Sequence, residues 1–76
     1  NENEIVVYSN QNEIVILASE NIKEIIVFDV LGRKLYHNEK VNEKEFLVAK
    51  LTQSNQALLV KTTLTNGQSI TKKVVF

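Results

Sequence analysis

The chain offers few side chains that could do chemistry. His37 is its single histidine, in the apolar stretch Leu35-Tyr36-His37-Asn38, and cysteine is absent. A metal site built on His37 would need three or four ligands, and no second His or Cys can supply them. A catalytic His37 would need a nucleophile or orienting partner placed by the fold. We therefore predict that His37 is a solvent-facing strand residue, with no metal, cofactor-binding or catalytic role.

The charged residues that follow His37 have a simple interpretation. Glu39, Glu43 and Glu45 interleave with Lys40 and Lys44. A calcium loop places carboxylates at alternating positions around a glycine, and this segment has none. The chain also lacks a phosphate-binding glycine loop and a nucleophile-elbow serine. We predict a solvated charged segment and a protein that is not an enzyme and uses no cofactor.

Length and composition exclude further classes of function. The chain has 76 residues, nine basic and nine acidic groups, and a formal net charge of zero. Such a chain makes one small domain, and it lacks the basic footprint that nucleic acid requires. No apolar run approaches the ~18 residues of a membrane helix. Its first four residues have no initiator Met and no signal-peptide pattern. We expect residues 1–76 to be one domain excised from a longer precursor.

Apolar residues occur in short runs rich in Ile and Val, which favours strands over helices. Seven strands are predicted: Glu4–Ser9, Glu13–Ala18, Glu24–Asp29, Lys34–Val41, Glu45–Val48, Ala57–Thr65 and Gln68–Phe76. Short strands separated by short turns indicate a sandwich or barrel. The predicted fold class is all-β, a compact sandwich of about seven short antiparallel strands.

Turn residues separate these strands. Asn66-Gly67 predicts a hairpin with a type I′ turn, which needs positive φ at both positions. In Asp29–Arg33, Gly32 supplies a positive φ and Asp29 can bond backbone amides. Ser19–Asn21 predicts another turn. In the polar loop between the fifth and sixth predicted strands, Leu51 is expected to cover an open end of the core.

Two segments resemble a known family, the C-terminal sorting domains carried by cargo of the Bacteroidetes type IX secretion system. The first is IKEIIVFDVLGRKLY, residues 22–36, and the second is ALLVKTTLTNGQSITKKVVF, residues 57–76. The family has an apolar strand of the form Val-x-Ile-Tyr-Asp, a two-residue spacer and Gly-Arg or Gly-Lys. Its ending has Leu-Val-Lys, an Asn-Gly turn, and Thr-Lys-Lys followed by apolar residues. The matching residues are Ile25, Val27, Phe28, Asp29, Gly32, Arg33, Asn66, Gly67, Lys72, Lys73, Val74 and Phe76.

The resemblance covers the chain from about Glu4 to Phe76, and the chain stops where the family does. The commonest variant of the family has Gly-x-Tyr where this chain has Gln56-Ala57-Leu58. Gln-x-Leu-Leu-Val-Lys instead resembles the less common type C variant.

The resemblance implies a small immunoglobulin-like β-sandwich that acts as a non-catalytic secretion signal. Family members direct the cargo domain that precedes them from the periplasm through the outer-membrane translocon, to the cell surface or the medium. The implied partners are translocon components and, in many members, a sortase-like cysteine protease that removes the domain. The resemblance does not imply that the domain itself inserts into a membrane or that it binds nucleic acid.

The alternative is a small immunoglobulin- or fibronectin-like adhesion or glycan-binding module of a surface protein. A sorting domain must be the last domain of its precursor, whereas an adhesion module can occupy any position and repeat. A glycan-binding module would also need exposed aromatic residues that form a platform. The aromatic residues of the chain are Tyr8, Phe28, Tyr36, Phe46 and Phe76, of which we expect the core to contain at least two.

Overall fold

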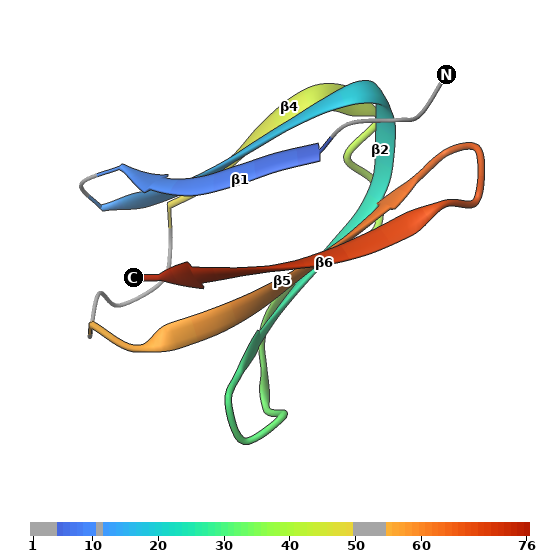
Figure 1. Ribbon diagram of the computed structural model, residues 1–76. Coiled ribbons are helices and arrows are strands. Elements are labelled where there is room, and N and C mark those ends of the chain that lie inside the picture. Colours follow the sequence, from blue (N-terminus) through green and yellow to red (C-terminus); the bar gives the residue numbers. More distant parts are fainter. Residues whose placement is uncertain (1–4, 11, 50–54) are drawn as a thin grey trace.

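The computed structural model describes residues 5–10, 12–49 and 55–76, and these form a curled antiparallel β-structure (Figure 1). Its strands are β1 (Ile5–Asn10), β2 (Glu13–Asp29), β3 (Lys34–Asn38), β4 (Glu43–Val48), β5 (Ala57–Leu64) and β6 (Ser69–Val75). The arrangement confirms the predicted class, a small all-β, antiparallel, sandwich-like fold. Leu51 and the start of the predicted first strand at Glu4 lie outside the described residues.

The predicted second and third strands are one continuous strand, β2, and the predicted turn at Ser19–Asn21 is wrong. β2 has 17 residues, and its pairing register shifts between Leu17 and Ile22 opposite β4 and between Ile22 and Glu24 opposite β5. Such irregularities bend a strand and let it pass from one sheet layer to the other. The polar residues thus mark a bend and not a chain reversal.

β2 is shared by both layers of the sandwich. Its first part pairs with β1 and β4, and its last part pairs with β3 and β5, while β6 pairs with β5. Figure 1 shows β2 curving from the β1 side of the molecule toward β5, and β1 lies against β6. The two layers therefore close around a common interior.

Two hairpins use the same three-residue turn. In each, the N–H of a glycine donates to the carbonyl of the residue three positions earlier. These bonds run from Gly32 N to Asp29 O and from Gly67 N to Leu64 O, both at 3.0 Å. Gly32 has φ 85° and Gly67 has φ 93°. The Asn66-Gly67 hairpin is confirmed, but its predicted type I′ turn is wrong because Asn66 does not have positive φ. A type I turn closed by a glycine bulge replaces it.

The core lies between the two layers and is built from aliphatic side chains. Alternating residues of β2 point into it, and Phe76 is buried beside them, as the alternation of the last strand predicts. Tyr36 and Phe46 pack at its margin with ring centroids 6.2 Å apart. The fully enclosed members of the core, at 0–2% exposure, include Ile14, Ile16, Ile22, Ile25, Val27, Val48, Val60, Leu64 and Phe76.

Strand boundaries near the β3–β4 connection differ from the prediction. β3 ends at Asn38 instead of Val41, and β4 begins at Glu43 instead of Glu45. Asn42 has φ 52°, so the backbone leaves the extended conformation there, and Val41 is buried. None of the described residues forms a helix long and apolar enough to cross a membrane.

Candidate functional site

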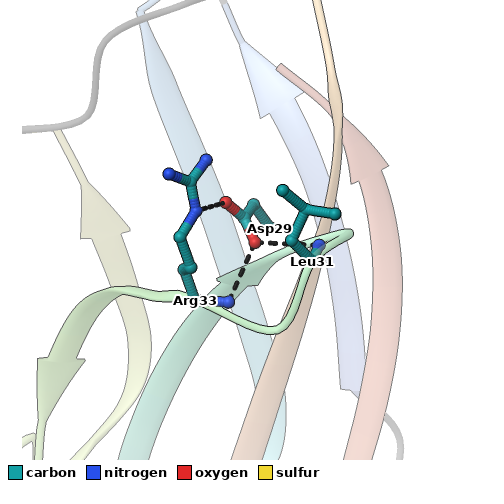
Figure 2. Close-up of polar contacts among 3 residues, drawn as sticks. All are labelled: Asp29, Leu31 and Arg33. Carbon is teal, nitrogen blue, oxygen red and sulfur yellow. Dashed lines mark hydrogen bonds and ion pairs between the residues drawn. The ribbon is translucent and has the colours of Figure 1, made fainter.

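The turn between β2 and β3 is built around the carboxylate of Asp29 (Figure 2). Its Oδ1 accepts hydrogen bonds from the backbone N–H groups of Leu31 and Arg33, each at 2.9 Å. Its Oδ2 accepts a bond from Arg33 Nε at 2.6 Å. Asp29 is only 2% exposed. One buried carboxylate therefore accepts hydrogen bonds from two backbone N–H groups of the turn and from Nε of Arg33.

These bonds favour the ionised form of Asp29. The hydrogen bond from the Arg33 backbone lowers the pKa of Asp29 most, and the Arg33 side chain and the Leu31 N–H lower it further. Burial acts in the opposite direction and is outweighed, so the pKa lies below its ordinary value. The turn is therefore charged and fully hydrogen-bonded near neutral pH.

The same turn presents apolar side chains to solvent. Val30 is 67% exposed and Leu31 is 76% exposed, and the Arg33 side chain is also largely exposed. A fixed backbone loses little conformational freedom on binding, which lowers the cost of recognition. Two aliphatic groups and a guanidinium on a rigid turn are suited to binding a partner protein.

Strand β5, which belongs to the second motif singled out in the sequence, lies between β2 of the first motif and β6. Val60 pairs with Val27 on one side and Lys72 on the other; Leu59 likewise joins Phe28 to Lys73, and Leu58 joins Asp29 to Val74. Residues more than forty positions apart in the chain thus form three adjacent rows across β2, β5 and β6. The two motifs therefore lie side by side in one sheet, and of these three rows only that of Phe28, Leu59 and Lys73 is on the outer face.

Alternation along β6 divides its residues between two faces. Val74 and Phe76 are buried, and Phe76 is fixed by a backbone bond from its N–H to Gln56 O at 2.9 Å. Lys73 and Val75 lie on the outer face, where Val75 is 58% exposed. Lys72 and Lys73 therefore face opposite ways, as the sequence predicts.

Not all predicted site residues lie together. Asn66 and Gly67 follow Leu64, where β5 ends. Asp29 pairs with Leu58, near the start of β5. Six residues of strand put the two turns roughly 20 Å apart. Ile25 is a core residue with no exposed surface. These three residues, like buried Val27, Val74 and Phe76, support the fold and do not belong to the surface around Asp29.

The structure also assembles a cluster that the sequence reasoning missed. His37 Nε2 lies 2.7 Å from Glu24 Oε2 and 3.8 Å from Glu39 Oε2. The sequence prediction considered only His and Cys as further metal ligands beside His37, and these two carboxylates were not included. The i, i+2 spacing of His37 and Glu39 in the predicted strand Lys34–Val41 was the available signal, but the approach of Glu24 depends on the pairing of β2 with β3.

The fold defines this chain as a small all-β, sandwich-like domain, and its β2–β3 turn exposes Val30 and Leu31. Over residues 1–76, its sequence matches the family described as a domain of unknown function, DUF8694, and the chain belongs to that family. No curated protein matches it.

Proposed function

We propose that this domain is a non-catalytic secretion signal that directs a cargo protein through the type IX outer-membrane translocon to the cell surface or medium. The observation that carries the proposal is the outer-face row of Phe28, Leu59 and Lys73, in which β2 and β6 flank β5. Both sequence motifs that resemble sorting domains contribute to that one surface. A signal read by a receptor needs such a continuous surface.

The chemistry of this surface suits a protein partner. Val30, Leu31 and Val75 have exposed side chains, Phe28 and Leu59 are half-buried, and Arg33 and Lys73 carry positive charge. Apolar anchors with neighbouring cations are typical of protein–protein recognition. The implied partners are translocon components and the sortase-like cysteine protease that acts on many sorting domains. The route leads through the periplasm and outer membrane.

Export of a fusion protein tests the proposal. The domain is joined to the C-terminus of a periplasmic reporter in several bacteria that have a type IX system, and reporter activity is measured outside the cell. We expect export of the wild-type fusion and its loss in a Val30→Ser/Leu31→Ser variant, because both side chains project into solvent and contribute little to folding.

Leu47→Ser is the matched control, since Leu47 is an exposed leucine of β4 in the other layer. Its fusion should be exported normally. A folded wild-type fusion that stays in the periplasm of every host would contradict the secretion proposal. Equal export of the turn variant and the control would exclude the Asp29 turn as the recognised feature.

A further inference from the structure

The outer face of the β2–β3 hairpin gathers three metal-ligating side chains, those of Glu24, His37 and Glu39. One ligand atom from each lies within 4.8 Å of the other two. Glu24 comes from β2 and His37 from β3, and Glu39 follows the end of β3. The three groups thus converge from both sides of the hairpin, although their order in the chain gives no metal-binding motif.

The strand pairing explains this convergence. His37 pairs with Ile26, so Glu24, two residues earlier in β2, lies on the same face and diagonal to the imidazole. After β3, the Lys40 N–H donates to Asn38 Oδ1 at 2.9 Å and fixes the bend that carries Glu39. The Glu24 and His37 side chains are each about one-third exposed, at 29% and 31%. The ligands are partly sheltered and still reachable from solvent.

The two carboxylates of the cluster are not fully balanced by protein groups, because a proton on His37 could balance only one of them. Among the described residues, no lysine or arginine forms an ion pair with Glu24 or Glu39. His37 Nε2 carries at most one proton and lies 2.7 Å from one carboxylate and 3.8 Å from the other. Two carboxylates this close repel each other, and a cation between them would relieve that repulsion.

We propose that Glu24, His37 and Glu39 bind one divalent cation of the zinc class. Imidazole nitrogen and carboxylate oxygen both bind Zn²⁺ at about 2.0–2.2 Å, which separates tetrahedral ligands by roughly 3.4 Å. The observed separations of 2.7 and 3.8 Å lie on either side of that value. Small side-chain rotations would bring the three atoms to one ion, and water would complete its coordination.

The proposed site would link β3 to β2. β3 has five residues and pairs only with β2 among the described strands. A metal ion that binds the folded hairpin and not the unfolded chain stabilises the fold by mass action. In a domain that has no cysteine for disulfides, this site would fasten an edge strand.

Titration of the full chain with ZnCl₂ tests the proposal. Isothermal titration calorimetry should give one equivalent of Zn²⁺, and a saturating concentration should raise Tm by at least about 5 °C, an effect that EDTA reverses. His37→Gln and Glu39→Gln should each weaken Zn²⁺ binding by about tenfold or more. Removal of a residue that only hydrogen-bonds to a metal ligand already lowers metal affinity by about tenfold. Glu45→Gln, which removes an exposed carboxylate from β4, should bind like the wild type.

NMR locates the ion. Amide signals of residues 24, 37 and 39 should shift on addition of Zn²⁺ while those of β6 stay in place. Absence of a binding heat and of a Tm rise would overturn the proposal, as would equal binding by His37→Gln and wild type. If His37→Gln is unfolded in EDTA, Glu39→Gln decides the matter, because the Glu39 side chain is 67% exposed.

Discussion

The carboxylate of Asp29 accepts three hydrogen bonds while it is almost completely buried. Two of the donors are backbone N–H groups of the turn itself, so loss of the carboxylate would leave them without partners at a closed hairpin. A buried acceptor of this kind influences stability more than an exposed ion pair. The single residue Asp29 therefore gives the turn both its rigidity and its dependence on pH.

Asp29→Asn should lower Tm at neutral pH. The substitution puts an NH₂ group in the place of Oδ2, and this group cannot accept the hydrogen bond from Arg33 Nε. The pKa of Asp29 is lowered in the folded state, so its stabilisation is present above the unfolded value of about 3.9 and is lost as pH falls through the folded value. The Tm difference between wild type and Asp29→Asn should therefore shrink below about pH 4.

Thermal melts at a series of pH values measure this difference. Glu20→Gln, at an exposed position of β2, is the control and should follow the wild type throughout. A Tm difference for Asp29→Asn that stays constant into the acid range would show that ionisation of Asp29 does not support the turn.

Gly32→Val should reduce the free energy of unfolding by roughly 1–3 kcal/mol, because φ at Gly32 is 85° and a β-branched residue is strained there. A Cβ at this position would meet no atom within 4 Å, so the cost would come from the backbone and not from a clash. Gly32→Asn should cost less, because Asn tolerates positive φ better. Equal urea denaturation midpoints for both variants would contradict this explanation.

At the scale of elements, β6 carries two different surfaces on one strand. Val74 faces Leu58 and the core, and Val75 pairs with Ala57 and faces outward. Lys72 shares the inner face of this edge strand, where an exposed charge discourages pairing with another chain. The stability of the strand should therefore depend on its inner face and its recognition by a partner on its outer face.

Val74→Ala should lower the free energy of unfolding by roughly 1–2.5 kcal/mol, because it removes two buried methyl groups and leaves a cavity. Val75→Ala removes the same atoms from a 58% exposed position and should change stability by less than about 0.5 kcal/mol. Urea denaturation of the pair measures both. If Val75→Ala is the more destabilising variant, the face assignment of β6 is wrong.

For the whole molecule, the sharing of β2 joins the two layers into one structural unit. The radius of gyration of 11.5 Å is close to the roughly 11.4 Å expected of a 76-residue globular domain. Every other described strand pairs with β2, except β6, which reaches it through β5. If β2 leaves, only the pairing of β5 with β6 remains among the described strands, so the domain should unfold in one cooperative step.

Ile16→Val tests this cooperativity. It removes one methyl group that is buried between the layers and should cost about 0.5–1.5 kcal/mol. NMR signals from β1 and from β6 should report the same shift in the urea midpoint, although the mutated residue pairs with β1 and not with β6. Different midpoints from the two strands would show that the layers unfold separately.

The sequence by itself determined the all-β class, the two glycine hairpins and the inward face of the last strand. These features depend on local physics: β-branched runs favour strands, glycine permits positive φ, and side chains alternate with period two. The candidate site was predictable to the same extent. Asp29, Gly32 and Arg33 act within five consecutive residues, so a local pattern could indicate their turn.

Only the tertiary structure decided which residues separated in the chain lie together. The polar residues Ser19–Asn21 predict a turn, but pairing with β4 at Leu17 and Ile22, and with β5 from Ile22 onward, carries the strand through the bend. The rows that join Asp29 to Val74, and the approach of Glu24 to His37, depend on strand register. Register is fixed by burial of the whole sheet, which no short segment contains.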